Sequence, residues 1–387
     1  MMRIIKNGKV YGPEYLGEVD VLMVGNKIMK IEKDIDISGC LLDVEVIDAK
    51  DKIVAPGFID QHVHIIGGGG EAGFHSRTPE VMLSKVVEAG ATTIVGLLGT
   101  DGSTRHIESL LAKAKGLENE GITTYIHTGS YELPSVTLTG SVKKDIMFID
   151  KVLGVKIAIS DHRSSHITKQ ELIRLASNVR IAGMLSNKPG IVHMHMGNAE
   201  EKLDMVMDIV NETDIPIKHF VPTHVTRTEE LLNQAMEFAK MGGHIDITSC
   251  GELNEGKPMK PSKAVAQCIA RGVPVENITM SSDGNGSMPR FDSEGNIIGL
   301  GIGSLNSQCA AFKAMVKKEG LDISTALKVI TSNVAKLLEI YPVKGCIKVG
   351  SDADIVLMDE ELNINMVIAK GKKMMEKGKV IVKGTFE

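Results

Sequence analysis

The segment from Pro56 to Gly73, PGFIDQHVHIIGGGGEAG, contains two histidines separated by one residue, followed by four glycines and a glutamate. Residues i and i+2 of a β-strand point to the same side, so His62 and His64 would share one face of a strand after the apolar residues FID. Such a pair can bind a metal ion, although buried histidines that only support structure are also common. The pair alone leaves both interpretations open.

Further polar residues lie at the ends of later apolar runs, and each run is a candidate strand: Lys156 in GVKI, His195 in IVHMHMG, His224 in FVPTH and Asp283 in ITMSSDG. Taken singly, each has a structural explanation, such as a histidine that bonds a carbonyl or a lysine that reaches solvent. Their recurrence at the ends of different strands favours one common site. Several imidazoles and a carboxylate form a ligand set that suits zinc.

The elements that must position these residues show two patterns. Residues 1–55 and 345–387 both indicate short strands and turns, and we expect them to meet as one small β-sandwich domain. In residues 56–344, short apolar runs alternate with amphipathic segments such as TRTEELLNQAMEFAKMG. About eight such repeats over roughly 280 residues are typical of a (β/α)8 TIM barrel, an α/β fold. A doubly wound sheet is the alternative, but no GxGxxG follows a strand.

Composition limits the function classes. The chain has 387 residues, of which 43% are hydrophobic and 24% charged, as expected for a soluble globular protein. Its net charge of -5 argues against a nucleic-acid partner. We find no signal peptide at the N-terminus and no run of about 20 apolar residues that could span a membrane. The five scattered cysteines fit reduced thiols, so we expect a cytoplasmic protein.

Together these motifs resemble the amidohydrolase superfamily. The resemblance rests on PGFIDQHVH, the strand-end lysine, the two later histidines, the aspartate of SSDG and the closing segment GCIKVGSDADIVLMD. Within the superfamily, the isoaspartyl dipeptidases are similar in HIIGGGGEAGFHSRTPE, GLLGTDG, TGSYELPSVTLTGS, KIAISDHRSSH, VHMHMG, PTHVTR and SSDGNGSMP. The resemblance covers nearly the whole chain and implies a barrel enzyme that hydrolyses the isopeptide bond of β-aspartyl dipeptides.

The resemblance implies a binuclear zinc centre. Its six ligands would be the histidine pair of the first strand and four residues from later strands: His62, His64, Lys156, His195, His224 and Asp283. The first two histidines and the aspartate would hold one zinc ion, and the later two histidines would hold the second. Lys156 would bridge the two ions as a carboxylated lysine, together with a hydroxide. A bare ammonium cannot bind a cation, so the lysine does require some such modification.

The resemblance also implies catalytic and substrate-binding roles. The bridging hydroxide would attack the carbonyl, Asp283 would carry its proton to the leaving amine, and Tyr131 would donate a hydrogen bond to the oxyanion. A β-aspartyl dipeptide has one free ammonium and two carboxylates. The implied substrate-binding residues are Glu71, Thr100, Tyr131, Arg163, Arg227 and Ser287. Glu71 would bind the ammonium, and the two guanidinium groups suit carboxylates.

Two alternatives remain at this stage. A cyclic amide or imide hydrolase of the dihydropyrimidinase type would keep the metals but would not need Glu71 and two arginines for a zwitterion. A non-catalytic scaffold with the same fold would be expected to lose ligands, whereas all are present here. The resemblance further implies a homo-oligomer, specifically an octamer. The sequence leaves open which residue follows the isoaspartate and which metal is used.

Overall fold

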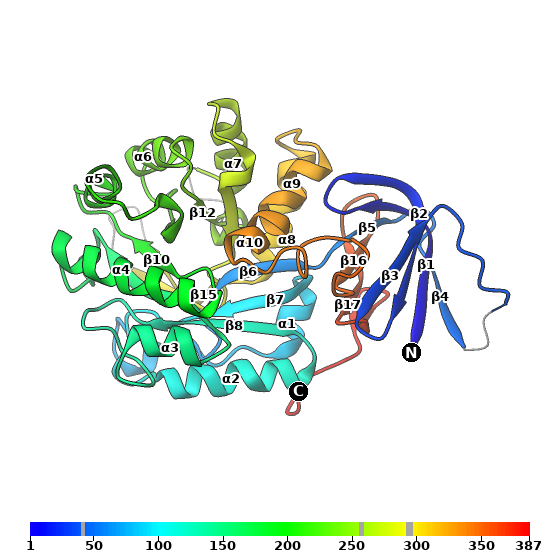
Figure 1. Ribbon diagram of the computed structural model, residues 1–387, viewed down its shortest axis with the longest axis horizontal. Coiled ribbons are helices and arrows are strands. Elements are labelled where there is room, and N and C mark those ends of the chain that lie inside the picture. The colour runs from blue at the N-terminus through cyan, green and yellow to red at the C-terminus, as the bar shows by residue number, and fades with distance from the viewer. Residues whose placement is uncertain (40–42, 255–258, 292–296) are drawn as a thin grey trace.

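The computed structural model of the protein describes residues 1–39, 43–254, 259–291 and 297–387. Figure 1 shows a central parallel sheet surrounded by helices and, beside it, a β-rich part that contains both the N-terminal and the C-terminal strands. The N-terminal and C-terminal strands therefore lie together, although the whole central part separates them in sequence, while the last residues run back to the barrel, where the Thr385 amide donates to Glu120.

The central sheet has eight parallel strands in the order β13-β12-β11-β10-β9-β8-β7-β6. Their bounds are β6 Phe58–Val63, β7 Ala91–Gly96, β8 Thr123–Gly129, β9 Val152–Ile159, β10 Ile191–Met196, β11 Phe220–Thr223, β12 Ile245–Thr248 and β13 Ile278–Ser281. Val63, the last residue of β6, forms a parallel bridge with Gly284, which lies just after β13, and this bridge nearly closes the sheet. The predicted (β/α)8 barrel is thus confirmed.

Helices surround the barrel (Figure 1). The α-helices are α1 Leu83–Glu88, α2 Ile107–Glu120, α3 Val142–Phe148, α4 Lys169–Ser186, α5 Asp204–Glu212, α6 Glu229–Lys240, α7 Pro261–Ala270, α8 Asn306–Lys317, α9 Ile323–Ile330 and α10 Ser332–Leu337; the 3-10 turns are η1 Phe74–Ser76, η2 Ile217–His219, η3 Ser249–Leu253 and η4 Val275–Asn277. Sequence explains their limits: α4 starts at a capping box of Thr168 and Glu171. Helix α6 buries Leu232 and Met236, one turn apart, against the barrel.

Strands from both ends of the chain form the outer sheet. Its order is β19-β18-β17-β16-β5-β1-β2-β3, with β4 paired to β1. The bounds are β1 Met2–Tyr11, β2 Tyr15–Val24, β3 Lys27–Glu32, β4 Val44–Asp48, β5 Ile53–Pro56, β16 Ile355–Met358, β17 Ile364–Ala369, β18 Lys372–Glu376 and β19 Lys379–Val380. The strands follow one continuous hydrogen-bonded path, and residues from both ends, including Val10, Val21, Val54, Ile355 and Ile368, bury a shared apolar core. The expected β domain built from both termini is therefore present.

The joint between the two ends is polar as well as apolar. Strand β5 pairs with β16 in antiparallel register from Ile53 to Pro56. Nearby, the buried Lys344 ammonium lies 2.6 Å from a carboxylate oxygen of Asp354 and 2.8 Å from one of Asp352. A buried lysine with two carboxylate partners is strongly constrained in position. Lys344 also donates to the hydroxyl of Thr123 in β8 at 2.7 Å, which joins this cluster to the barrel.

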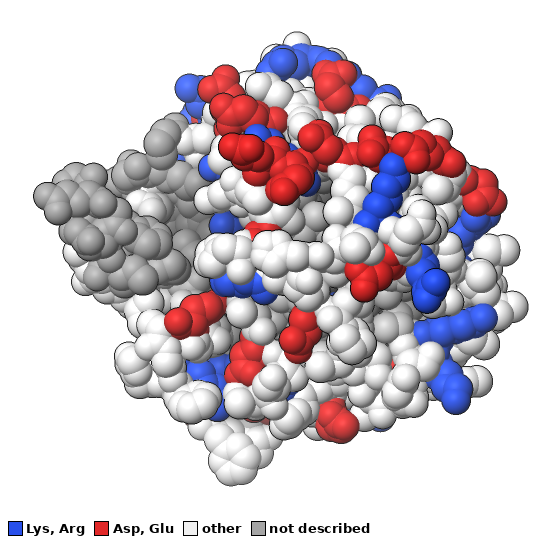
Figure 2. Space-filling view, turned by 90° about the vertical axis from the view of Figure 1, so that its left-hand side faces the viewer, with Lys and Arg blue, Asp and Glu red and all other residues white. Residues whose placement is uncertain are grey.

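A hairpin follows the last barrel strand and consists of β14 Ser287–Phe291 and β15 Ile297–Ile302. In the part of the chain that the structure describes, we find no helix both long and apolar enough to cross a membrane. Figure 2 shows one face of the molecule, on which acidic and basic side chains are interspersed with uncharged surface. That face does not present the continuous basic surface that nucleic-acid binding requires.

Candidate active site

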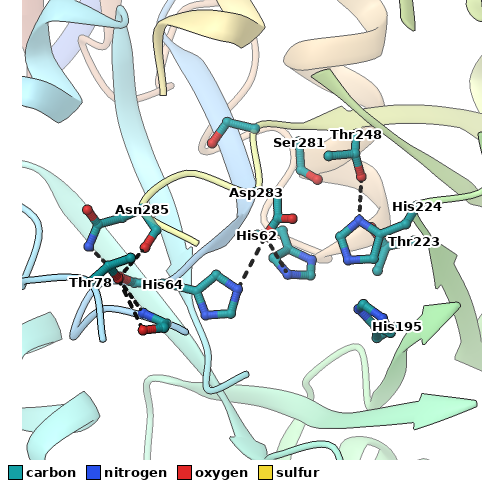
Figure 3. A network of polar contacts seen from close by, with 12 residues as sticks. His62, His64, Thr78, His195, Thr223, His224, Thr248, Ser281, Asp283 and Asn285 are labelled. Atoms are coloured by element: carbon teal, nitrogen blue, oxygen red, sulfur yellow. Dashed lines mark hydrogen bonds and ion pairs between the residues drawn. The ribbon is translucent and has the colours of Figure 1, made fainter. Parts of the chain in front are cut away.

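Two histidines and an aspartate meet where the first and last barrel strands end. His62 belongs to β6, His64 directly follows it, and Asp283 lies just after β13. The Asp283 carboxylate is 3.5 Å from His62 Nε2 and 3.2 Å from His64 Nε2. Potential ligand atoms of all three residues lie within 4.8 Å of one another. Figure 3 shows the two imidazoles directed toward the carboxylate, so the three side chains could bind one cation.

Two of the predicted ligands have an unusual backbone conformation. Asp283 has φ of 54° and His224 has φ of 64°, in the left-handed region that non-glycine residues rarely occupy. Such strain persists where surrounding bonds enforce it. Here the His64 amide donates to the Gly284 carbonyl at 2.9 Å, and the Arg227 amide donates to the His224 carbonyl at 3.1 Å. Strain at these positions is typical of a functional site.

Lys156 projects from β9 into the same region and is completely buried. Its amino nitrogen lies 3.4 Å from His62 Nε2. Burial lowers the pKa of this amine to about 7, although the carboxylates of Asp283 and Asp246 act in the opposite direction. The neutral, nucleophilic form of the amine is therefore well populated near neutral pH.

The later two histidines lie opposite, on the neighbouring strands. His195 belongs to β10, and His224 follows the end of β11. Their ring centroids are 4.6 Å apart, and the His224 ring lies 4.9 Å from that of His62. The Tyr131 hydroxyl oxygen is 2.6 Å from His195 Nδ1. The structure thus gathers both predicted groups of ligands and the predicted oxyanion donor in one region.

Burial holds the imidazoles neutral. For His62, His195 and His224, burial lowers the pKa well below the ordinary histidine value, and neighbouring positive charges lower it further. At His195 the hydrogen bond to Asp161 acts in the opposite direction on the pKa but does not outweigh burial. A neutral imidazole has the free lone pair that a metal ion needs. The donor set of neutral imidazoles, a carboxylate and a modifiable amine therefore fits zinc.

Outer partners fix which nitrogen of two imidazoles faces the centre. His62 Nδ1 lies 2.9 Å from His193 Nε2, so its Nε2 is directed toward Lys156 and Asp283. His224 Nδ1 lies 2.5 Å from the Thr248 hydroxyl, which leaves its Nε2 for a ligand. Contacts of this kind orient metal-binding histidines.

The predicted substrate-binding residues form a charged group near this centre. Arg163 Nη1 donates to Glu71 Oε1 at 3.3 Å, and the Thr100 hydroxyl donates to the same oxygen at 3.0 Å. Arg227 Nη2 lies 3.3 Å from His195 Nε2. The side chains predicted for ammonium and carboxylate recognition are thus adjacent to the side chains predicted for metal binding.

The four glycines allow the chain to turn from the histidine pair to Glu71. Gly69 has φ of 75°, and a Cβ there would lie 3.1 Å from the Cβ of Ser287, which places Ser287 against this turn. Arg105 stabilises the turn, because its buried guanidinium donates to the carbonyls of Gly68 and Thr78, both at 3.0 Å. The glycine segment is therefore a fixed support for Glu71 as well as a tight turn.

Sequence reasoning assigned no role to two residues that contact the site, Asp161 and Thr248. Asp161 lies 2.9 Å from His195 and Thr248 lies 2.5 Å from His224. Both occur at the end of a barrel strand, Asp161 just after β9 and Thr248 as the last residue of β12. The same strand-end position that identified the ligands could have identified them, since that end of a barrel contains the active site.

Known proteins resemble this chain in sequence and in fold. Residues 53–386 match the amidohydrolase family. The structure is similar to a β-aspartyl dipeptidase from Fervidobacterium islandicum AW-1 in complex with β-Asp-Leu dipeptide, with 44% identity and a TM-score of 0.93 over 98% of this chain and 97% of that one. A dihydroorotase from Aquifex aeolicus is 25% identical over 98% of this chain and 95% of its own length. The dihydropyrimidinase from Brevibacillus agri NCHU1002, at 18% identity and a TM-score of 0.69 over 98% and 96% of the two chains, shares the fold.

Proposed function

The chain belongs to the amidohydrolase family, and from this premise we propose that it is a binuclear zinc hydrolase that cleaves the isopeptide bond of β-aspartyl dipeptides. The observation that carries the proposal is the Glu71–Arg163 pair, whose opposite charges lie 3.3 Å apart beside the histidine cluster. An ammonium and a carboxylate on one carbon atom, as in the isoaspartyl residue, would match such a pair. Similarity over nearly the full chain to a protein in complex with β-Asp-Leu supports the same substrate.

The metal ligands follow from the two groups of imidazoles. His62, His64 and Asp283 would hold one zinc ion, and His195 and His224 would hold the other. Zinc bound there would lower the pKa of water to about 7 and polarise the scissile carbonyl. The imidazoles of His62, His195 and His224 lie in surroundings that lower their pKa, as a ligand requires.

Lys156 would bridge the two metal positions after carboxylation. Its neutral amine nitrogen would attack carbon dioxide, form an N–C bond and release one proton, which leaves an anionic carbamate with two oxygen donors. Burial supports this step because it lowers the pKa of the amine to about 7. The side chain thereby gains a negative charge, as a position between two cations demands.

During hydrolysis, Asp283 would transfer a proton and Tyr131 would stabilise the negative charge of the intermediate. The Asp283 carboxylate would accept a proton from the nucleophilic water and pass it to the leaving amine. Burial raises the pKa of the Tyr131 hydroxyl above its ordinary value, so this group stays protonated and can donate to the developing oxyanion.

Each charged group of the dipeptide would be bound by a different side chain. Glu71, supported by Thr100, would bind the α-ammonium, and the adjacent Arg163 would bind the carboxylate on the same carbon. Arg227 would then be free for the carboxylate of the second residue, and Ser287 would add a hydrogen bond from the glycine turn. Two separate guanidinium groups thus suit a substrate with two carboxylates.

The test is a hydrolysis assay on zinc-loaded protein with β-Asp-Leu, α-Asp-Leu and dihydrouracil. We expect cleavage of β-Asp-Leu alone. Ring opening of dihydrouracil without dipeptide cleavage would instead support the cyclic amide hydrolase, a class to which a 25% identical dihydroorotase belongs. If the protein binds no zinc and hydrolyses none of the three substrates, the result would support the non-catalytic scaffold. The expectations of a cytoplasmic location and a homo-octamer stay predictions, the second of which light scattering would check.

A further inference from the structure

The Asp161 carboxylate joins His195 to Arg163. Its Oδ2 lies 2.9 Å from His195 Nε2 and accepts a hydrogen bond from Arg163 Nη2 at 2.8 Å. Its Oδ1 accepts from the Arg163 Nε at 2.9 Å and from the Arg163 amide at 2.8 Å. The side chain of Asp161 is only 3% exposed. Both oxygens are therefore fully engaged, with a predicted metal ligand and with a predicted substrate-binding residue.

These contacts determine the tautomer of His195. Arg163 donates three hydrogen bonds to the two oxygens of Asp161, two of them from its guanidinium, and such a paired carboxyl group is ionised. An ionised carboxylate can only accept, and the nearby Nη2 atoms of Arg163 and Arg227 can only donate. Nε2 of His195 must therefore carry the proton that is shared with Asp161. Its Nδ1 then keeps the lone pair, on the side of Tyr131.

We propose that Asp161 is a positioning residue that holds His195 in the orientation and tautomer for metal binding and, with the same carboxylate, aims Arg163 at the substrate. This inference rests on the proposed function. His62 and His224 have neutral outer partners, His193 and Thr248. A carboxylate partner makes an imidazole a stronger donor than a neutral one does. Asp161 would thus strengthen the second metal position and couple it to substrate binding.

Three variants separate the two roles: Asp161→Asn, Arg163→Met and the double variant. Metal retention is measured as zinc content during titration with a chelator, and KM for β-Asp-Leu is measured at saturating zinc. Arg163→Met should raise KM and retain zinc like the wild type. Asp161→Asn should raise KM and lower the affinity for one of the two zinc ions by about 10- to 100-fold, the usual effect of losing such a partner. The double variant should show the KM of Arg163→Met and the zinc affinity of Asp161→Asn.

Two results would overturn the proposal. One is zinc retention by Asp161→Asn equal to that of the wild type, since a purely structural residue would lower thermal stability without weakening zinc. The other is an effect of Asp161→Asn on zinc affinity that is seen in the wild type but not in the Arg163→Met background. Asp161 would then act on the metal only through Arg163. If Asp161→Asn does not fold, Asp161→Glu and Asp161→Ala are compared instead. Asp161→Glu keeps the negative charge, so it should retain more zinc than Asp161→Ala. Because zinc retention needs no substrate, this arm stays valid if β-Asp-Leu is not hydrolysed.

Discussion

The amino nitrogen of Lys156 lies 3.4 Å from Nε2 of His62, in a part of the barrel that solvent does not reach. No carboxylate in the described ranges forms an ion pair with this lysine, unlike Lys344, which has two such partners. A buried amine without a salt bridge is costly as a cation and reactive as a neutral base. This relationship distinguishes Lys156 from a structural lysine and leads to the first prediction.

Replacement of Lys156 by alanine should remove zinc and activity together. The loss of kcat/KM should exceed the about 10- to 100-fold decrease that the loss of an outer partner causes, because a direct ligand is missing. Metal analysis and β-Asp-Leu hydrolysis measure both effects, and added short-chain carboxylic acid should partly restore activity by filling the space. The control is Lys188→Ala, since Lys188 donates to the carbonyls of Ile146 and Ile149, away from the histidines. Full zinc content and normal turnover in Lys156→Ala would exclude the bridging role.

Replacement of Arg227 by alanine should act mainly on KM. The side chain is exposed at the site and contacts His195 at 3.3 Å, so it can meet a substrate carboxylate without supporting the core. A hydrogen bond to a charged group contributes about 1.5–3 kcal/mol, which corresponds to roughly a 10- to 150-fold increase in KM. Steady-state kinetics with β-Asp-Leu measure this effect at constant zinc content. An unchanged KM would remove Arg227 from the substrate site.

Replacement of Arg105 by methionine should disturb Glu71 from a distance. The Arg105 guanidinium is buried, forms no ion pair within the described residues and donates to the carbonyls of Ile66, Gly68 and Thr78. Its loss removes the guanidinium donor from all three carbonyls, of which Gly68 keeps the Thr78 amide, and should lower the free energy of unfolding by about 2–5 kcal/mol. We also expect KM to rise and the glycine turn to become sensitive to limited proteolysis, while zinc content is unchanged.

Arg77→Met is the matched control for the Arg105 experiment. Arg77 lies close by but its side chain is 36% exposed, and its nearest carboxylate oxygen, on Asp101, is 4.0 Å away. Solvated pairs of this kind contribute little to stability. If Arg77→Met and Arg105→Met changed KM and proteolysis to the same extent, the support of the glycine turn could not be attributed to Arg105.

The stability of the metal-free protein should fall on acidification. Burial, aided by the charge of Lys156, lowers the pKa of His127 from 6.5 to about 3 in the folded state. As the pH falls below 6.5, the unfolded chain takes up the proton and the folded chain does not, so His127 lowers stability progressively between pH 6.5 and 3 at up to about 1.4 kcal/mol per pH unit. Asp60 acts in the opposite direction, because burial raises its pKa to about 7 and the folded state is protonated first.

A single variant isolates the contribution of His127. Urea unfolding of the metal-free protein at pH 6.0 and pH 5.0 gives the change in the free energy of unfolding. His127→Phe should reduce that change by about 1 kcal/mol, since the unfolded state loses one titrating imidazole while Asp60 contributes equally to both proteins. The exposed His106→Gln serves as control, because solvent reaches its imidazole in both states. Equal changes in wild type and His127→Phe would contradict the buried, neutral assignment.

Much of the architecture was predictable from local patterns. Apolar runs alternate with amphipathic segments, and that alternation is sufficient to predict the barrel strands and the strand ends near which His62, His195 and Asp283 lie. Lys156 was expected at a strand end but lies inside β9, because the apolar run continues to Ile159. The reason is geometric: parallel strands of one barrel bring their carboxyl ends to the same rim. The roles of Glu71, Tyr131 and the arginines were not predictable in this way, because they occur in loops without periodicity, and only the resemblance to known sequences suggested them.

What the sequence by itself determined is therefore which side chains reach the rim of the barrel, because strand periodicity is a property of neighbouring residues. The tertiary structure decided which of these side chains touch. Asp161 meets His195 from an adjacent strand, Arg105 reaches the carbonyl of Gly68, and Arg163 pairs with a glutamate 92 positions earlier. Such contacts depend on the paths of separate loops after folding, and on the burial that sets the protonation of each group.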